Sequence, residues 1–395
     1  MRIRVNAHAV VLLLGWGALA GPPDALKRTG FETGIQAAEV EFRNGTTVLR
    51  GTIIQPAASG PGPGVVILGG SERGARNAYK RRIASDFAAS GISALVYDSP
   101  GTGASTGNAV LQTKDDRVVE ALAAVRFLRG RPGIEPHTVG LWGISEGSGI
   151  ALLAAGKDPE VAFVVSVSPA LGVAPVEISR FRIEMTGYEN RFSQEDIGRA
   201  LVLEEILYEL FSGAGLAEWR LIGMKVRNWQ EEPWAELIEA VKGARRAALP
   251  EERKKTKDAL IKCLDFWKEK GWFRLAVPDV GRFERLAALE AEAFLAFLDN
   301  NPWARGDWLD HLRASAELSG VRSPVLAIWG ENDLFLPPHR SAAVLRRLLQ
   351  GTKIDLTIEI LPGIGHTMAY SGQTDISPKY TEIVKDWLKA KVRIQ

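Results

Sequence analysis

The segment Val139-Gly140-Leu141-Trp142-Gly143-Ile144-Ser145-Glu146-Gly147 carries the strongest structural signal in the chain. Its first four residues are typical of a buried strand, and the apolar run at 150–155 is typical of a helix. Between them, two glycines flank a serine in a G-x-S-x-G pattern. Such a pattern permits a sharp turn that holds the serine in a strained conformation at the end of a sheet. The alternative is a glycine-rich turn with an incidental serine.

Strands and helices alternate on both sides of this segment. A hairpin is predicted within 38–55, because two extended runs flank Asn44-Gly45. Further strands are predicted at 65–68, 93–97, 138–142, 161–167, 325–329 and 354–361, and helices at 81–89, 115–128, 150–155, 337–349 and 380–392. This alternation predicts an α/β fold with a doubly wound, mostly parallel sheet.

The strand signal is absent from 172–318, which is rich in Glu, Ala, Leu, Arg and Lys at helical spacing. Helices are predicted there at 201–211, 234–248, 251–270 and 283–298. A helical insertion into one sheet domain explains the length of 395 residues better than two consecutive domains. We therefore expect a core formed by 21–171 and 319–395, with a helical cap at 172–318 between the sixth and seventh strands.

The N-terminus has the pattern of a secretory signal peptide. Arg2 and Arg4 precede an apolar run at 9–20 that ends in Ala18-Leu19-Ala20. An uncleaved anchor is the alternative, but the run is short against the roughly 20 residues that span a bilayer. We expect residues 1–20 to be removed and the protein to be periplasmic or secreted.

Charge and motifs exclude several classes of function. Removal of the two arginines with the signal peptide would change the formal net charge from +2 to zero. A neutral chain has no electrostatic reason to bind nucleic acid or an acidic membrane surface. The single cysteine, Cys263, is expected to be a small buried apolar residue. No pattern for zinc or calcium binding is present in the sequence, so no metal and no cofactor are expected.

A serine hydroxyl needs a base to act as a nucleophile at neutral pH. His366 follows a late strand in the glycine-rich turn Leu361-Pro362-Gly363-Ile364-Gly365-His366, where the imidazole can reach the end of the sheet. His137 precedes a strand and should lie at the opposite end. His311 falls in the helical segment and His339 begins a helix, so His366 is the predicted base.

An acidic residue should hold the imidazole in one tautomer. Asp333 follows the strand at 325–329, and the apolar residues and Pro337 after it would anchor its turn. Glu331 is the nearest rival. Asp98 also follows a strand, but there it is expected to tie down the glycine-rich turn 98–107. The resulting order along the chain is serine, aspartate, histidine.

Acyl transfer also needs donors for a developing oxyanion. One predicted donor is the backbone N–H of Glu146, which follows the serine. The other is the N–H of Ser71, in the loop Gly69-Gly70-Ser71-Glu72-Arg73-Gly74. A phosphate-binding loop is the alternative, but no Lys-Ser/Thr pair follows it.

Together these motifs resemble the α/β-hydrolase superfamily over about 38–171 and 321–392. The chain looks most like exported bacterial esterases and serine aminopeptidases, which carry a helical cap. It departs from many relatives at Gly69-Gly70, where they have His-Gly. The resemblance implies the α/β-hydrolase fold and a catalytic triad.

The expected activity is a two-step acyl transfer on Ser145, with a small-molecule carboxylic ester as substrate. The alternatives are a serine aminopeptidase acting on short peptides and a non-catalytic binding protein that kept the fold. Thioester hydrolysis is disfavoured, because coenzyme A esters are scarce outside the cytoplasm. Tryptophans of the helical segment are expected to be cap core, although some could line an acyl pocket. The candidates for that lining are Trp219, Trp229, Trp267 and Trp272. The sequence leaves the oligomeric state open.

Overall fold

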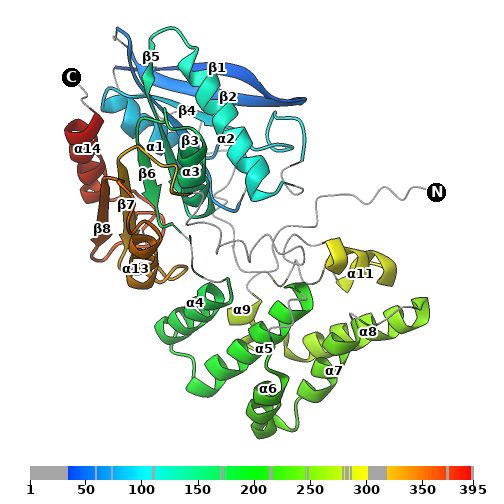
Figure 1. Cartoon of the computed structure of the whole chain (residues 1–395). Coiled ribbons are helices and arrows are strands. Elements are labelled where there is room, and N and C mark those ends of the chain that lie inside the picture. The colour runs from blue at the N-terminus through cyan, green and yellow to red at the C-terminus, as the bar shows by residue number, and fades with distance from the viewer. Residues whose placement is uncertain are drawn as a thin grey trace. The chain divides into compact units, whose positions relative to one another are not determined.

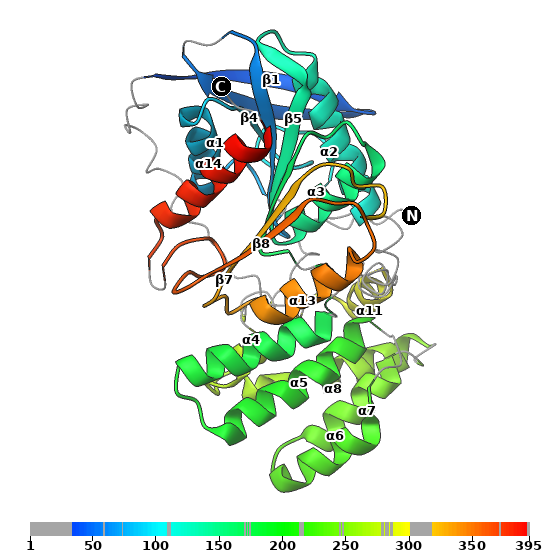
Figure 2. The same ribbon diagram turned by 60° about the vertical axis from the view of Figure 1, so that its left-hand side comes forward.

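The structure is a computed structural model (Figures 1 and 2). It describes residues 34–392 except 58–59, 73, 109–111, 170, 172, 174, 213–216, 245, 247–248, 278–279, 281–283, 285–286, 301–317 and 371–372. The predicted signal peptide at 1–20 lies outside the described residues. The described residues divide into a helical unit within Ala174–Asp310 and a sheet unit within Ala20–Val173 and His311–Gln395.

The sheet unit is built on eight strands in the order β1-β2-β4-β3-β5-β6-β7-β8. The strands are β1 (Ile35–Asn44), β2 (Thr47–Pro56), β3 (Gly62–Leu68), β4 (Ser93–Tyr97), β5 (Ile134–Ile144), β6 (Val164–Val167), β7 (Val325–Gly330) and β8 (Leu356–Leu361). β2 is antiparallel to both β1 and β4, whereas all other neighbours are parallel. The predicted mostly parallel sheet is confirmed.

Helices cover both faces of this sheet. They are α1 (Ala78–Ala89), α2 (Lys114–Arg129), α3 (Glu146–Lys157), α13 (Pro338–Leu348) and α14 (Pro378–Val392). Alternate residues of β3 separate the two cores, since Val66 packs in the cluster with α2, α3 and α13 and Val65 in the cluster with α1 and α14. Because both faces are buried, the central strands are almost wholly apolar. Figure 2 shows the two helical layers of this doubly wound arrangement.

Local signals explain where several elements begin. The hairpin of β1 and β2 turns at Gly45-Thr46, one residue later than the predicted turn, and Gly45 has the positive φ that such turns require. Helix α2 begins at a capping box, in which the Thr113 hydroxyl accepts from the backbone N–H of Asp116. In return, the Asp116 carboxylate accepts from the N–H of Thr113.

The helical unit follows β6 and precedes β7 in the chain. Its helices are α4 (Pro175–Glu189), α5 (Gln194–Ser212), α6 (Trp219–Val226), α7 (Trp234–Ala244), α8 (Pro250–Trp267), α9 (Phe273–Ala276) and α11 (Ala291–Asn300), with the short 3-10 helix η3 (Arg227–Trp229). The unit has a hydrophobic core of its own. The predicted helices at 201–211, 234–248 and 251–270 correspond to α5, α7 and α8, and parts of the ranges 234–248 and 283–298 lie outside the described residues.

Helices α4 and α6 were not predicted. Among the described residues, no helix is both long and apolar enough to cross a membrane.

Candidate active site

Ser145 occupies a strained turn between β5 and α3. Its φ of 55° and ψ of −121° lie in a region that costs a non-glycine residue about 1–3 kcal/mol. A Cβ atom at Gly143 would lie 2.2 Å from the carbonyl oxygen of Gly147, and one at Gly147 would lie 2.2 Å from that of Gly69. The two glycines are therefore a steric requirement of the turn, as the G-x-S-x-G pattern predicted.

Asp333 and His366 form a close pair. The Asp333 Oδ2 atom lies 2.8 Å from His366 Nδ1, and the carboxylate is almost fully buried. Its other oxygen accepts from the backbone N–H groups of Phe335 and Leu336, at 2.8 and 2.9 Å. These bonds hold the carboxylate in place, so that it can fix the Nδ1–H tautomer of the imidazole.

A glycine brings the histidine loop close to the aspartate loop. A Cβ atom at Gly330, the last residue of β7, would lie 2.2 Å from the carbonyl oxygen of Ile364. In addition, the N–H of Asn332 donates to that same carbonyl at 2.9 Å. The turn after β7 and the turn after β8 are thereby joined, which places His366 beside Asp333.

The three predicted triad residues follow β5, β7 and β8 at the same edge of the parallel part of the sheet. The Ser145 N–H donates to the Val167 carbonyl at 2.8 Å, and the next residue, Ser168, donates its hydroxyl to the His366 carbonyl at 3.3 Å. The Ser145 hydroxyl is buried and makes no hydrogen bond within the described part of the chain. Catalytic hydrogen bonds are often long without substrate and shorten when it binds.

The predicted oxyanion loop lies against the nucleophile. A Cβ atom at Gly70 would lie 3.4 Å from the Cβ atom of Ser145. Glu146 begins α3, so its backbone N–H belongs to the first turn of a helix, where N–H groups lack partners within the helix. The loop and the helix start therefore meet at Ser145. Donation to an oxyanion by the N–H groups of Ser71 and Glu146 stays a prediction.

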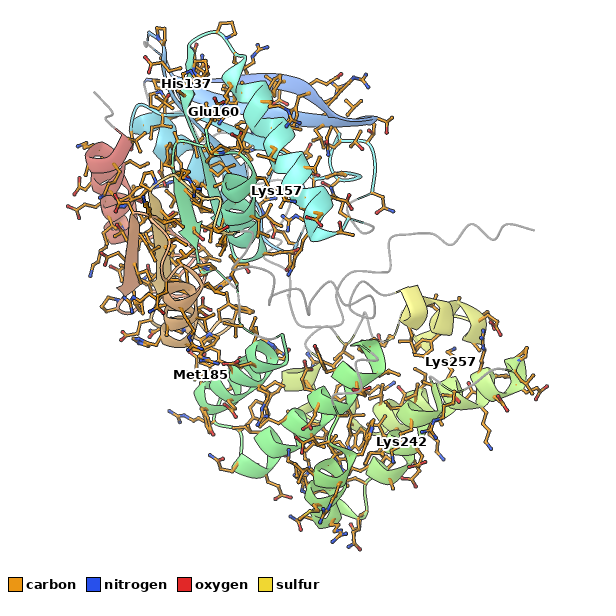
Figure 3. All side chains as sticks on the ribbon, viewed as in Figure 1. His137, Lys157, Glu160, Met185, Lys242 and Lys257 are labelled. Atoms are coloured by element: carbon orange, nitrogen blue, oxygen red, sulfur yellow. The ribbon has the colours of Figure 1, made fainter. Side chains whose placement is uncertain are left out.

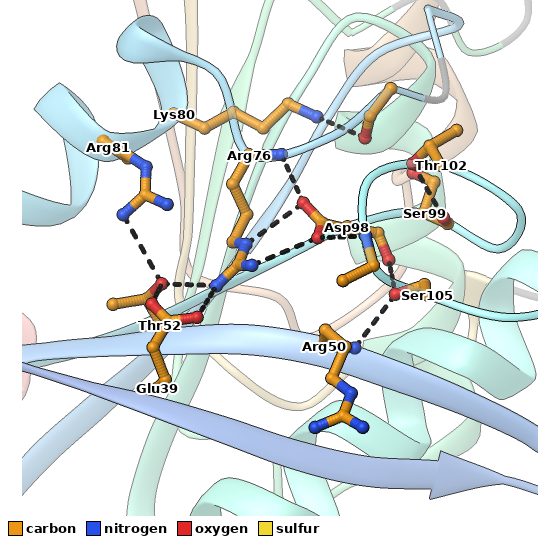
Figure 4. Close-up of polar contacts among 12 residues, drawn as sticks. Glu39, Arg50, Thr52, Arg76, Lys80, Arg81, Asp98, Ser99, Thr102 and Ser105 are labelled. Atoms are coloured by element: carbon orange, nitrogen blue, oxygen red, sulfur yellow. Dashed lines mark hydrogen bonds and ion pairs between the residues drawn. The ribbon is translucent and has the colours of Figure 1, made fainter. Parts of the chain in front are cut away.

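Asp98 ties down the turn after β4, as predicted (Figure 4). Its carboxylate accepts from the Ala104 N–H at 3.1 Å, from the Arg76 N–H at 2.8 Å and from the Arg76 guanidinium at 3.0 and 3.2 Å. Burial alone would raise the pKa of Asp98, but the hydrogen bonds from Arg76 and Ala104 lower it below its usual value. Arg76 also pairs with Glu39 at 2.6 Å, a contact that the sequence did not predict.

The other histidines lie away from this edge or outside the described residues. His137 is near the start of β5, at the end opposite Ser145 (Figure 3). His339 is an exposed residue at the start of α13, and His311 lies outside the described residues.

The four tryptophans proposed as substrate contacts lie in the helical unit. Trp267 and Trp272 are buried in its core, whereas Trp219 and Trp229 are only partly buried and line a surface groove. Trp267 and Trp272 both contact the central Trp234, with ring centroids 4.4 and 6.1 Å apart. Substrate contact stays a prediction, and accessible ring surface for it is present on Trp219 and Trp229.

The described residues contain no group of three or more His, Cys, Asp or Glu side chains that could hold a metal ion. Cys263 is buried, as predicted, and burial raises the pKa of its thiol to about 11. A thiol of this kind is protonated at neutral pH and is a weak nucleophile.

The family model described as serine aminopeptidase, S33, matches residues 65–195 of this chain. This range contains the predicted oxyanion loop and the elbow but ends before Asp333 and His366.

Among curated proteins, a thiohydrolase of Arthrinium phaeospermum is 37% identical over 134 residues, which are 33% of this chain and 43% of that protein. A thiohydrolase of Aspergillus aculeatus is 34% identical over 140 residues, which are 34% of this chain and 42% of that protein. A polyketide transferase of a Penicillium species is 32% identical over 137 residues, or 34% and 45% of the two chains. The chain thus spans less than half the length of these relatives. They are fungal, so they do not support the expected placement among exported bacterial esterases.

Among solved structures, the α/β hydrolase GrgF from a Penicillium species matches with a TM-score of 0.50 and 19% identity, over 91% of this chain and 99% of that chain. At this identity the match concerns the fold alone. Together with the eight-stranded sheet and its elbow, this match shows that the chain has the α/β-hydrolase fold. The family model shows separately that residues 65–195 are similar to the serine aminopeptidase family.

Proposed function

We propose that this chain is a serine hydrolase that cleaves carboxylic esters through an acyl-enzyme on Ser145. One observation carries the proposal: a serine in a strained elbow shares a sheet edge with a hydrogen-bonded aspartate and histidine. A buried Asp–His pair beside such a serine is the arrangement that activates a hydroxyl. Similarity to a hydrolase family over residues 65–195 supports an enzyme.

The proposed reaction has two steps. His366 accepts the Ser145 proton at Nε2 as the Ser145 oxygen attacks the acyl carbonyl, and the N–H groups of Ser71 and Glu146 stabilise the oxyanion. The protonated imidazole then gives its proton to the leaving alcohol, and the acyl group remains on Ser145. In the second step, His366 takes a proton from a water molecule that attacks the acyl carbon, and it returns that proton to the Ser145 oxygen as the acid leaves. Asp333 stabilises the imidazolium in both steps.

Thioester hydrolysis is the second candidate. It is favoured by the names of two relatives, which are thiohydrolases at 37% and 34% identity. The same acyl-enzyme serves both reactions, because only the leaving group differs. Hydrolysis of aminoacyl amides is the third candidate, and it is supported by the serine aminopeptidase family match.

The test is a substrate panel combined with a nucleophile variant. Wild-type protein, Ser145→Ala and the control Ser85→Ala are assayed on matched p-nitrophenyl esters, thioesters and aminoacyl anilides. Ser85 is a suitable control because its hydroxyl bonds the Arg81 carbonyl within α1. We expect ester turnover by the wild type and the control but none by Ser145→Ala. Exclusive turnover of thioesters or anilides would replace the ester assignment, and undiminished turnover by Ser145→Ala would overturn the mechanism.

Export and cap function are separate proposals. The arginines and the apolar run at the N-terminus support a mature protein that begins near Gly21, in the periplasm or the medium. N-terminal sequencing of protein from each cell fraction tests this, and an intact Met1 on cytoplasmic protein would contradict it.

We also propose that the helical segment 172–318 sets substrate choice, because all three triad residues lie outside it.

A further inference from the structure

Arg117 is a buried arginine on α2 that contacts two segments next to the nucleophile, the loop after β3 and the start of α3. Its Nη2 atom donates to the carbonyl oxygen of Gly69 at 2.8 Å, and its Nη1 atom lies 3.1 Å from Glu146 Oε2. Gly69 begins the loop after β3, and Glu146 is the residue after Ser145. One guanidinium thus joins the two segments that supply the proposed oxyanion donors.

We infer that Arg117 is a positioning residue. It holds the two backbone segments that carry the proposed oxyanion donors, the N–H groups of Ser71 and Glu146, in a fixed position relative to each other. This inference rests on the proposed function, since it assigns a role within the same site. Arg117 touches neither the nucleophile nor the base in the contacts described, so it acts through the backbone that it holds.

The bond to Gly69 fixes the direction of the loop. A trans peptide is planar, so its carbonyl and the next N–H point in opposite directions. When Arg117 holds the Gly69 oxygen on the α2 side, the plane of the Gly69–Gly70 peptide is set. The backbone direction at Ser71 is then restricted, and Gly70 lies so close to Ser145 that a Cβ atom placed on it would be 3.4 Å from the Ser145 Cβ atom.

The ion pair with Glu146 fixes the other half. The side chains of Arg117 and Glu146 are only 8% and 10% exposed, so solvent screens the pair little. Burial alone would lower the pKa of Arg117, but Glu146 and the nearby Glu120 raise it, so the guanidinium stays charged. Glu146 is the first residue of α3, and anchoring its side chain restrains the start of that helix.

Arginine suits this task and lysine does not. The guanidinium is a rigid planar group whose nitrogens can bond two partners at once, whereas the lysine ammonium is a single point charge. Arg117→Lys keeps the charge near Glu146 but loses the simultaneous hold on the Gly69 carbonyl. This substitution therefore separates loop positioning from simple charge pairing.

The experiment compares wild type, Arg117→Lys, Glu146→Gln and the control Arg129→Met on one ester. Arg129 lies on the same helix and pairs with Asp158 at 2.7 Å, away from the oxyanion loop. Removing one oxyanion donor outright lowers kcat about 10²–10³-fold, and misplacing it should cost less. We expect kcat to fall about 10–100-fold in Arg117→Lys and about 3–10-fold in Glu146→Gln, with KM nearly unchanged.

Two further readouts separate positioning from a merely structural role. A trifluoromethyl ketone, which forms an oxyanion on the serine, should bind Arg117→Lys more weakly by the same factor as the fall in kcat. The acid limb of the pH profile of kcat/KM should stay in place, because the Asp333–His366 pair is untouched. Arg129→Met should match the wild type in both assays.

The outcomes distinguish this inference from the proposed function. If the wild type hydrolyses esters through Ser145 but folded Arg117→Lys and Glu146→Gln keep wild-type kcat and ketone affinity, the inference on Arg117 is wrong. If Arg117→Lys does not fold, a wild-type kcat in Glu146→Gln alone overturns it. If the wild type shows no turnover that depends on Ser145, the proposed function has failed instead.

Discussion

The sheet unit and the helical unit differ in how closely their sequences constrain their structures. In the sheet unit, a Cβ atom placed on Gly143, Gly147 or Gly330 would lie 2.2 Å from a backbone carbonyl oxygen, so no other residue fits at these positions. In the helical unit, Gly223 has open space where a Cβ atom would stand, and the tryptophans fill a shared core. The crowded glycines of the sheet unit specify one backbone conformation of the turns in which they lie. The tryptophans of the helical unit specify only that its interior is apolar. Chemistry could therefore be located from sequence in the sheet unit, but only packing could be inferred in the helical unit.

The largest effect should come from the orienting carboxylate in the sheet unit. Asp333→Asn keeps the shape of the side chain, but its amide favours the wrong imidazole tautomer, so kcat should fall by about 10⁴-fold. The measurement is steady-state ester hydrolysis with protein whose circular dichroism matches the wild type. The neighbouring acid Glu331→Gln is the matched control and should lose little activity. A loss in Glu331→Gln equal to that in Asp333→Asn would reverse the assignment of the third triad member.

The next effect concerns stability rather than catalysis. Asp98→Asn should lower the free energy of unfolding by about 2–3 kcal/mol at neutral pH, because it removes buried hydrogen bonds between a carboxylate and Arg76. The pKa of Asp98 is lowered in the fold. Its contribution is thus fully present above the unfolded value of about 4 and is lost as the pH falls through the folded pKa.

Urea unfolding at several pH values measures this difference. Glu41→Gln is the control. Glu41 on β1 forms an ion pair with Arg50 on β2, but the two side chains are 40% and 48% exposed, so this pair is solvated. That variant should lose no more than about 1 kcal/mol. A difference between Asp98→Asn and wild type that stays constant down to acid pH would contradict the role of the charge.

The smallest effect should come from the helical unit. Trp219→Ala and Trp229→Ala remove accessible rings, and we expect each to change the preference between short-chain and long-chain esters by about 1–3 kcal/mol. Turnover of the preferred ester should stay within about tenfold of wild type. Leu249→Ala is the control, because Leu249 is an exposed apolar residue that is not among those lining the groove. An unchanged chain-length profile in both tryptophan variants would remove the helical unit from substrate choice.

The sheet and the positions of Ser145, Asp333 and His366 could be predicted from the sequence, because strand ends and glycine turns are local features. The contacts of Arg76 with Asp98 and of Arg117 with Gly69 could not be predicted, because they join residues 22 and 48 positions apart. Nothing in the spacing of these residues reveals such non-local pairs. The sequence indicates only that each of these two arginines lies near the start of a helix, and it does not indicate which residue the arginine contacts.

Helix α4 was missed for a different reason. Its apolar residues Phe181, Ile183 and Met185 do not lie on one face of a helix, so the local sequence shows no clear helical periodicity. Packing against the rest of the helical unit overrides this local pattern, since Ile183 is fully buried in the core of that unit. Tertiary context therefore decided the element, and it was not present in the local sequence.

Ser145 is the residue that we propose becomes acylated during turnover. Protein is mixed with a p-nitrophenyl ester, quenched in acid during the first turnovers, digested and mapped by tandem mass spectrometry. Acid quenching preserves a serine ester that would otherwise be hydrolysed with His366 as the base. We expect an added acyl mass on the peptide that contains Ser145, and no added mass on the same peptide of Ser145→Ala. An acyl group on another residue, or rapid ester hydrolysis by Ser145→Ala, would contradict this proposal.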